Sequence, residues 1–429
     1  MIYAVGIFMV FLFFGMPVAF AIGISGFTFF LIRGGIPWTI LVQKSLSTTQ
    51  SFTMLSIPMF ILAGNLMNHT GITNRLVKLA NVLTGHMYGS IGQVSVVLST
   101  LMGGVSGSAV ADAAMECRIL GPEMIKRGYA PGWAAAVNCL TGLIVATIPP
   151  SMGLILYGTV GEVSIGRLFV AGFIPGFIMC GFMMIATAWS ARRYGYKPDH
   201  DKPYPLSVIL KACWDSIWAL LFPIILIVLI RGGVMTPSES GAFAVFYALV
   251  VGLFIYRELT WEKLKACVID SVKDISVTTM ILAFSGVFSY GVVYDQLPRD
   301  ITQVLVALTN NKYVLLLSII LMLTIFGMFM ETTVITLIVT PILLPVIKQY
   351  GIDPVHFGII MMTTVTMGCS TPPVGVALYT CSTIMDCSVQ ETTRYAVPLF
   401  VAIFATLGVV ICFPRLILWL PNLVYGVAR

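Results

Sequence analysis

Two double prolines are the residues of this chain whose type and spacing most directly suggest chemistry. Pro149-Pro150 and Pro372-Pro373 lie in the runs Thr-Ile-Pro-Pro-Ser-Met-Gly (147–153) and Ser-Thr-Pro-Pro-Val-Gly (370–375). A double proline removes two backbone donors and disfavours a helical conformation at the residue before it, so each run predicts a helix that opens. The alternative is a simple kink in each helix.

The opened backbone at these prolines predicts cation sites. Carbonyls about one turn upstream lose their hydrogen-bond partners, and the hydroxyls of Thr147, Ser151, Ser370 and Thr371 add further oxygens. Oxygen ligands suit a hard cation such as sodium. Because the two breaks are equivalent, we expect two sodium sites.

Two further breaks interrupt long apolar segments. They are Gly-Gly-Val-Ser-Gly-Ser at 103–108 and Gly-Met-Phe-Met-Glu-Thr-Thr at 327–333. Glycine permits a tight turn and hydroxyls can satisfy exposed backbone groups, so 103–108 predicts the tip of a helical hairpin. The alternative is close helix packing through small residues.

Acidic residues within apolar runs are candidates for function. Glu331 lies at a break and is predicted to be a ligand neighbour or a helix-cap acceptor, and Asp112 could pair with Arg118 or cap a half-helix. For Glu116 we favour an ion pair near the cytoplasmic edge. Asn65 is interpreted as a helix-helix contact more than as a ligand.

Other chemistries lack their signatures in the sequence. The nine cysteines form no CxxC pair, the four histidines have no metal-ligand spacing, and no GxxxxGK[ST] sequence for ATP is present. Isolated acids argue against an enzyme, and the absence of a Lys/Arg patch with interleaved aromatics argues against a nucleic-acid partner.

The composition predicts a multi-pass membrane protein. Of 429 residues, 58% are hydrophobic and only 10% are charged, and the mean hydropathy is +0.97. Such a surface needs lipid as its solvent. Segments long enough to span a bilayer are predicted, with the first as a retained span and not a cleaved signal, at 2–32, 52–68, 90–120, 132–158, 168–191, 215–231, 240–256, 275–295, 313–347, 355–381 and 395–421. Amphipathic stretches at 38–51 and 260–274 are expected at the membrane interface.

The chain matches itself when it is shifted by 223 residues, which predicts a duplication. Trp, Pro and Gly residues coincide, and these would rarely match by chance: Trp38 with Trp261, Gly104 with Gly327, Pro122 with Pro345, Pro131 with Pro354, and Pro149-Pro150 with Pro372-Pro373.

Loop charges predict that the two repeats are inverted. Basic residues crowd 192–211 and 257–273, which the positive-inside rule places in the cytoplasm. Counting outward from there puts 33–50 and 296–312 outside, the N-terminus in the cytoplasm and the C-terminus outside. The long segments 90–120 and 313–347 are then re-entrant hairpins that open from opposite sides.

We therefore expect an all-α fold with two inverted repeats. The first repeat covers 1–200, with the hairpin 90–120 and the unwound helix 132–158. A cytoplasmic loop and linker cover 201–223. The second repeat covers 224–429, with the hairpin 313–347 and the unwound helix 355–381. Inverted repeats bring their broken helices together near the bilayer midplane, where substrate and coupling ions bind.

Four motifs carry a resemblance to a known family. Gly-Val-Ser-Gly-Ser-Ala-Val-Ala-Asp (104–112), Ala-Thr-Ile-Pro-Pro-Ser (146–151), Met-Glu-Thr-Thr (330–333) and Ser-Thr-Pro-Pro-Val-Gly (370–375) resemble the large membrane subunit of tripartite ATP-independent periplasmic (TRAP) transporters. The resemblance implies an elevator transporter in the bacterial inner membrane, sodium coupling, a small four-helix membrane subunit and a periplasmic substrate-binding protein. It also implies a small carboxylate substrate, with sialic acid among the family's substrates.

The resemblance assigns residues to sites. One sodium site would use Ser106, Ser108, Val145, Pro149 and Gly153. The second would use Gly327, Met330, Thr332, Ser370 and Thr371. The substrate carboxylate would lie near Ser108, Ser151, Glu331 and Thr333. The acidic side chain of Glu331 is awkward beside an anion.

Two other functions stay open. A stand-alone sodium symporter of divalent anions shares the inverted layout and needs no partner protein. A membrane-embedded enzyme or a passive channel is the second alternative, and an enzyme would show His, Asp or Cys clustered at helical spacing within the spans.

Overall fold

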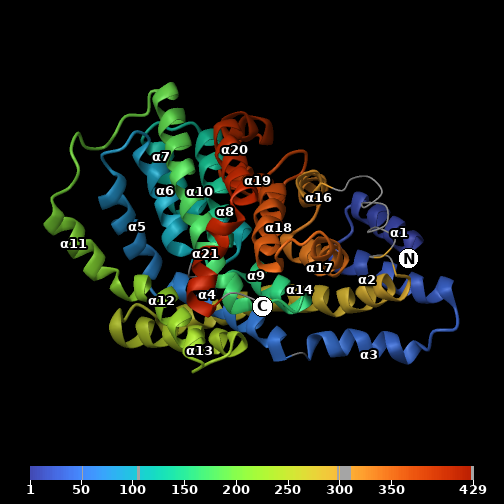
Figure 1. The fold of residues 1–429 in the computed structure, drawn as a ribbon. Helices are drawn as coiled ribbons and strands as arrows, with labels where there is room; N and C mark the ends of the chain where they lie inside the picture. The colour runs from blue at the N-terminus through green and yellow to red at the C-terminus, as the bar shows by residue number, and fades with distance from the viewer. Residues whose placement is uncertain (51, 104–106, 297–298, 300–310, 427–429) are drawn as a thin grey trace.

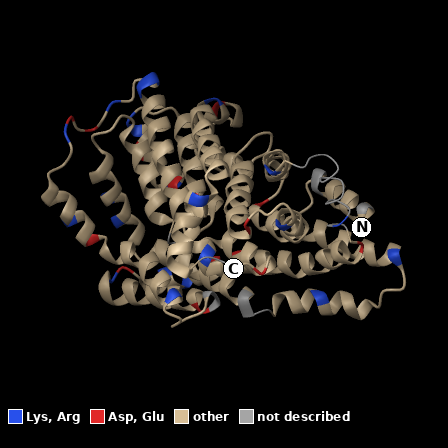
Figure 2. Cartoon of the chain, in the orientation of Figure 1, with Lys and Arg blue, Asp and Glu red and all other residues tan. Residues whose placement is uncertain are grey.

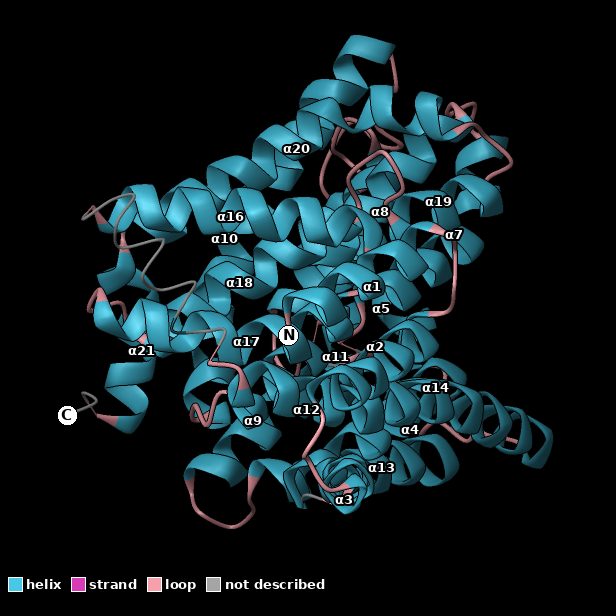
Figure 3. Cartoon of the chain, turned by 90° about the vertical axis from the view of Figure 1, so that its right-hand side faces the viewer, coloured by secondary structure: helices cyan, strands magenta, loops and turns pink. Residues whose placement is uncertain are grey.

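The computed structural model describes residues 1–50, 52–103, 107–296, 299 and 311–426, and over these residues it contains helices and no strands (Figures 1 and 3). This confirms the all-α fold. The first half contains α1 (Ile2–Phe13), α2 (Val18–Arg33), α3 (Trp38–Thr49), α4 (Ser56–His69), α5 (Ile72–Thr84), α6 (Ser90–Met102), α7 (Ala109–Lys126), α8 (Pro131–Thr147), α9 (Met152–Val160) and α10 (Ile165–Tyr194). The second half contains α11 (Leu206–Asp215), α12 (Ile217–Arg231), α13 (Pro237–Val250), α14 (Trp261–Tyr294), α16 (Lys312–Phe329), α17 (Thr332–Gln349), α18 (Pro354–Cys369), α19 (Val376–Ile384), α20 (Val389–Cys412) and α21 (Pro414–Tyr425).

The duplication is visible in the helix boundaries. Helices α7 and α17 both have 18 residues, and Thr332 follows Ala109 by the predicted shift of 223. Helices α8 and α18 both begin with a proline at the first helical position, which suits that position because its missing N–H has no helical partner. The double prolines form cis peptide bonds in both halves.

The segment 90–120 is a re-entrant hairpin, as predicted. Gly89, before α6, donates its N–H to the carbonyl of Tyr196 at 3.3 Å, and Arg127, after α7, pairs with Asp199. Both open ends of the hairpin therefore lie beside the segment 196–199. The tip lies at the other end, where Gly107 packs against Pro150.

The second hairpin enters from the opposite end of the molecule. Helices α16 and α18 run in parallel, with Lys312 within electrostatic reach of His356 and Gly327 against Gly368. Helices α9 and α18 are antiparallel, because Tyr157 donates its hydroxyl to the carbonyl of Pro354 at 2.7 Å while Gly153 lies against Met362. The repeats are inverted, as the loop charges predicted. Their boundaries at 200 and 224 remain predictions.

The broken helices form the core. Every residue of α8 from Gly132 to Thr147 and of α18 from Val355 to Cys369 is buried. Long helices cover these broken helices. Helix α10 packs closely on α8, because Gly172 and Gly176 leave room for Thr147 and Ile148. Helix α20 packs on α18, where the His356 ring donates a hydrogen bond to the carbonyl of Val410 at 2.8 Å.

The prediction that 2–32 is one span is wrong. Gly15 has φ +77° between α1 and α2, and these helices fold back on each other. The Met1 ammonium and the guanidinium of Arg33 both pair with Asp295. The N-terminus thus lies on the same side as the segment after Arg33, whereas a single span placed them on opposite sides.

Two other predicted segments also differ. The stretch 260–274, predicted at the membrane interface, and most of the predicted span 275–295 form one continuous helix, α14, of 34 residues. The predicted span 395–421 is not one helix: α20 ends at Cys412 and α21 begins at Pro414, and Arg167 contacts the carbonyl of Gly426, after α21, at 2.6 Å. The described C-terminal end therefore lies beside 159–167, and both were predicted outside.

The surface suits a lipid environment. Within the described part of the chain, five helices are long and apolar enough to cross a membrane, or seven if each of two bent pairs forms one span. Figure 2 shows charged residues mainly at helix ends and in connecting segments, with long uncharged stretches between them. The chain is a multi-pass membrane protein.

The crossing of α16 and α18 depends on two facing glycines, and this yields a first prediction. A Cβ at Gly327 would lie 2.7 Å from the Cα of Gly368 and 2.8 Å from the carbonyl oxygen of Val365. We expect Gly327→Ala to lower the melting temperature of the detergent-purified protein in sodium-free buffer, because overpacking costs about 1–3 kcal/mol.

The matched control is Gly408→Ala in α20, where a Cβ would meet nothing within 4 Å. Alanine favours a helix over glycine by up to about 1 kcal/mol, so this variant should melt at the wild-type temperature or above. Equal melting temperatures for the two variants would contradict the close crossing.

Candidate functional site

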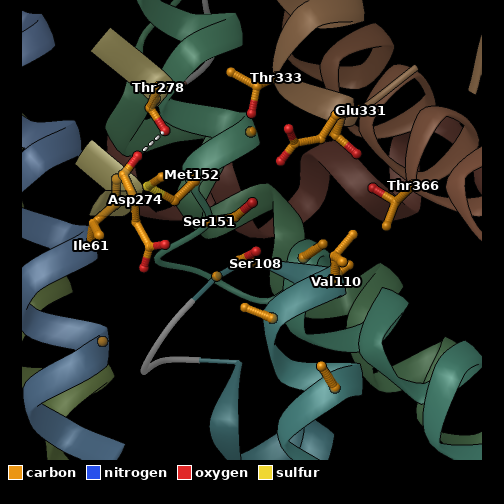
Figure 4. Close-up of a pocket in the computed structure, with 18 of the residues that line it drawn as sticks. Ile61, Ser108, Val110, Ser151, Met152, Asp274, Thr278, Glu331, Thr333 and Thr366 are labelled. Carbon is orange, nitrogen blue, oxygen red and sulfur yellow. Dashed lines mark hydrogen bonds between the residues drawn. The ribbon is translucent and has the colours of Figure 1, made fainter. Parts of the chain in front are cut away.

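A cavity of about 390 Å³ lies where both hairpin tips and a broken helix meet α4 and α14 (Figure 4). In the close-up, Asp274 and Thr278 of α14 lie on one side and Glu331, Thr333 and Thr366 on the other, with Ser108 and Ser151 between them. The cavity brings together the four residues that the family resemblance assigned to the substrate carboxylate, which are Ser108, Ser151, Glu331 and Thr333.

Three helices begin at this cavity. Ser108 precedes α7, Ser151 precedes α9 and Glu331 precedes α17, each in an extended backbone conformation and each without a side-chain hydrogen bond to its own helix. Helix N-termini carry unpaired N–H groups and the positive end of the helix dipole. Their convergence makes this cavity suitable for an anion.

The first hairpin tip packs closely on the first break. Gly107 has φ +66°, and a Cβ there would lie 2.6 Å from the carbonyl oxygen of Pro150, so only glycine fits. Among the predicted sodium residues of this half, Ser108 and Gly153 line the cavity, and Val145 is buried in α8 just before Pro149. Ser106 lies outside the described residues.

The second hairpin tip and the second break are also in contact. Gly375 donates its N–H to the carbonyl of Met328 at 3.0 Å, and Gly327 touches Gly368. The Cys369 thiol donates to the carbonyl of Met330 at 3.3 Å and lies 3.4 Å from the Thr332 hydroxyl. The structure thus brings Gly327, Met330 and Thr332 to the helix that ends at Ser370 and Thr371.

The predicted hydroxyl ligands fall into two kinds. Thr147 and Thr371 donate to carbonyls of their own helices, at 2.8 Å from Leu143 and 2.7 Å from Met367. The hydroxyls of Ser151 and Ser370 are buried and have no hydrogen-bond partner among the described residues. One buried hydroxyl per break is therefore available to a ligand, which fits the oxygen ligands of a hard cation.

The sequence reasoning missed the contribution of α4 and α14. The Asn65 amide donates to the Ser271 hydroxyl at 3.0 Å and to the Asp274 carboxylate at 3.2 Å. Asn65 therefore joins two helices, as predicted, but it also lines the cavity with Asp274 and Thr278. The spacing of Ser271, Asp274 and Thr278 places them on one helix face and could have indicated this wall.

The charges at the cavity are acidic. Asp274 and Glu331 are the charged residues among its described lining, and they lie within electrostatic reach of each other. Glu331 is open to the cavity. The helix N-termini favour an anion in this cavity, whereas the two carboxyl groups disfavour one when they are ionised.

The interpretation of Glu116 as one member of an ion pair is wrong. Its carboxylate is buried and accepts hydrogen bonds from the hydroxyls of Ser95, Ser99 and Thr141, at 2.6, 2.5 and 3.0 Å. Ser95 and Ser99 belong to α6, Glu116 to α7 and Thr141 to α8. Glu116 therefore joins the two arms of the first hairpin to each other and to the broken helix. Asp112 is buried in the first turn of α7, where a negative charge is stabilised by the helix dipole.

No three His, Cys, Asp or Glu side chains of the described residues converge on a site for a transition metal. A helical membrane protein with inverted hairpins and a cavity at their tips has the layout of a secondary transporter.

Comparison with known proteins identifies the family. Residues 5–416 match the family model "Tripartite ATP-independent periplasmic transporter, DctM component". The chain is 39% identical over 423 residues to the uncharacterized protein YgiK of Salmonella typhimurium, covering 97% of this chain and 96% of that protein. It is 35% identical over 423 residues to the sialic acid TRAP transporter large permease protein SiaM of Vibrio cholerae, covering 97% of each. The chain therefore belongs to the DctM family, a component of TRAP transporters.

A solved structure shares the fold. The YdaH transporter of Alcanivorax borkumensis matches with a TM-score of 0.62 over 89% of each chain, at 15% sequence identity. At this identity the match supports the fold alone.

The hydroxyls around Glu116 lead to the second prediction. Glu116→Ala should lower the free energy of unfolding by about 2–3 kcal/mol, because the buried Ser99 hydroxyl loses its acceptor and the hydroxyls of Ser95 and Thr141 each lose one partner. Glu116→Gln keeps an acceptor oxygen and the side-chain shape, so its loss should be smaller. Thermal unfolding of the detergent-purified protein measures both.

Glu123→Ala is the control, since Glu123 is half-exposed and forms a surface pair with Arg127 at 2.9 Å. Surface pairs contribute about 0–1 kcal/mol. A melting temperature of Glu116→Ala equal to that of Glu123→Ala would contradict a structural role for the buried carboxylate.

Proposed function

We propose that this chain is the large membrane subunit of a sodium-coupled importer of a small carboxylate in the bacterial inner membrane. A periplasmic substrate-binding protein delivers the substrate, and a small four-helix membrane subunit completes the complex. The observation that carries the proposal is the convergence of three helix N-termini, before α7, α9 and α17, on one cavity with a buried, unpartnered serine hydroxyl.

The charges at this cavity support the proposal of sodium coupling. The substrate is an anion, whereas the charged side chains among the described lining are Asp274 and Glu331. Sodium ions at the two breaks supply the missing positive charge. They enter as co-substrates at Ser106, Ser108, Val145, Pro149 and Gly153 in one half, and at Gly327, Met330, Thr332, Ser370 and Thr371 in the other. Bound sodium therefore strengthens binding of the substrate, and bound substrate strengthens binding of sodium. Each binds weakly without the other.

The elevator mechanism is supported by the position of the cavity between two groups of helices. Both hairpins and α9 form one wall, and α4 and α14 form the other. Movement of the hairpin group along α4 and α14 carries the bound carboxylate across the membrane while the tips and breaks remain in contact.

The substrate is proposed by class. The N-termini bind a carboxylate, and the hydroxyls of Ser108, Ser151 and Thr333 can bind hydroxyl or carbonyl groups of an organic acid. SiaM, which is 35% identical, is named for sialic acid, so sialic acid is the first candidate to test. Sodium-driven uptake without any binding protein would favour the stand-alone divalent-anion symporter.

Sodium dependence provides the third prediction. Uptake into proteoliposomes should rise more steeply than first order with sodium and should stop when choline replaces it. Ser370→Ala should raise the sodium concentration for half-maximal uptake by about tenfold, or roughly 1.4 kcal/mol of binding free energy, because the ion loses one oxygen ligand.

Thr364→Val is the matched control in the same helix, because the Thr364 hydroxyl is buried but already donates to the carbonyl of Ile360 at 2.7 Å. It should leave sodium dependence unchanged. Full uptake in choline would overturn sodium coupling.

Relative movement of the two walls is the fourth prediction. Val277 of α14 and Thr333 of α17 both line the cavity. A short cleavable thiol cross-linker across Val277→Cys and Thr333→Cys should stop uptake, because the cross-link ties the two walls together. Cleavage should restore uptake to the level of the same double variant before cross-linking.

The control pair lies in α19 and α20, neither of which contributes a residue to the described lining of the cavity. The hydroxyls of Ser382 in α19 and Thr392 in α20 are 2.8 Å apart, so cross-linking Ser382→Cys to Thr392→Cys should leave uptake largely intact. Full uptake with the first pair cross-linked would argue against the elevator.

A further inference from the structure

A second cavity of about 420 Å³ lies beside the first and has different lining residues. Its polar lining comes from α3, α9 and α14. These residues are Lys44, Ser47, Thr48, Thr159, Ser285 and Ser289.

The two cavities share three walls. Helix α14 contributes Thr278 to the first cavity and Ser285 to the second, and α9 contributes Gly153 to the first and Val160 to the second. Each step is seven residues, which is two helical turns or roughly 10 Å. Helix α17 also lines both, with Thr333 and Leu337. The second cavity is therefore the next space along the same boundary between helix groups.

The charge of the second cavity is opposite to that of the first. Lys44 is the only charged residue in its described lining, and its ammonium lies 5.7 Å from the ring centroid of Tyr290. Close packing fixes the backbone of Lys44 on α14, because a Cβ at Gly286 would lie 2.8 Å from the carbonyl oxygen of Lys44.

An unpartnered hydroxyl lies in the same cavity. Ser285 is 2% exposed, and its hydroxyl has no hydrogen-bond partner among the described residues. Elsewhere on this helix, Ser271 donates to the carbonyl of Cys267 and Ser276 to that of Val272. The free hydroxyl of Ser285 is thus available as a donor to a ligand, beside the ammonium of Lys44.

We propose that this second cavity is an anion-binding vestibule that takes the carboxylate of the substrate before the substrate reaches the cavity at the hairpin tips. Lys44 attracts the carboxylate, and the hydroxyls of Ser285 and Ser289 donate hydrogen bonds to it. The vestibule lies toward the Asp295 end of α14, on the side of Arg33. This inference rests on the proposed carboxylate transport.

Thiol labelling in the complete transporter tests the charge of the vestibule. Ser289→Cys, combined with Cys412→Ser to remove an exposed native thiol, is reconstituted in phosphatidylcholine vesicles. An anionic sulfonatoethyl and a cationic trimethylammonium-ethyl methanethiosulfonate are then compared. The anionic reagent should react faster, and Lys44→Gln should lower the ratio of the two rates by about tenfold.

Two variants control for side effects. Lys44→Arg keeps the positive charge and should preserve the ratio. Lys312 also lies over a tyrosine ring, 5.2 Å from the centroid of Tyr313, but it is not in the described lining of the vestibule. Lys312→Gln should therefore leave the ratio of labelling rates unchanged. A ratio that Lys44→Gln leaves unchanged would overturn the inference.

Protection experiments identify the ligand. Sialic acid or succinate, at constant ionic strength against chloride, should slow labelling by the anionic reagent, and Lys44→Gln should remove this protection. Protection only by phosphatidylglycerol in the vesicles would overturn the carboxylate assignment in favour of a lipid headgroup.

The two proposals fail separately. Sodium-driven carboxylate uptake together with a charge-independent labelling ratio would defeat the vestibule and leave the proposed function intact. Carboxylate protection at Ser289→Cys without any carboxylate uptake would defeat the proposed function and leave the binding site.

Discussion

Most of this structure depends on one constraint: the backbone N–H and carbonyl groups at the breaks of two buried helices need hydrogen-bond partners. Helices α8 and α18 are buried along their length, yet each ends at a double proline that cannot continue the hydrogen-bond ladder. Backbone groups without partners are costly at membrane depth. The hairpin tips meet this need, as when the N–H of Gly375 bonds to the carbonyl of Met328 and the Cys369 thiol bonds to that of Met330.

The same constraint produces the site. A helix that breaks and restarts presents a new N-terminus, and a hairpin presents another at its tip. Because the repeats are inverted, these N-termini arrive from opposite sides at one cavity, where Ser108, Ser151 and Glu331 precede three helices. The hydroxyls of Ser151 and Ser370 are left without protein partners, so the structure that repairs the breaks also leaves groups for a ligand.

Charge is distributed along the boundary between the two helix groups. The cavity at the hairpin tips has acidic groups from Asp274 and Glu331, and the neighbouring cavity has the ammonium of Lys44. In the function that we propose, an anion moves from the fixed positive charge of Lys44 to a cavity where sodium ions offset the two acidic side chains. In that proposed function, this arrangement links binding of a carboxylate in the central cavity to sodium, and the lysine favours the approach of the carboxylate.

The sequence by itself determined the repeat and the breaks, and the family resemblance assigned Ser108, Ser151, Glu331 and Thr333, which lie together at the cavity. Proline and glycine carry this information because their backbone restrictions are local, so Pro149-Pro150, Pro372-Pro373 and Gly107 act the same way in any fold. Only the tertiary structure decided the rest. The opposite cavity wall at Asp274, the hydroxyl partners of Glu116 and the position of Lys44 depend on contacts between residues far apart in sequence, such as Asn65 with Asp274. The turn at Gly15 divides a segment that is apolar enough to be one span. The sequence could not show this turn, because hydropathy measures the length of an apolar segment and not the direction of the chain.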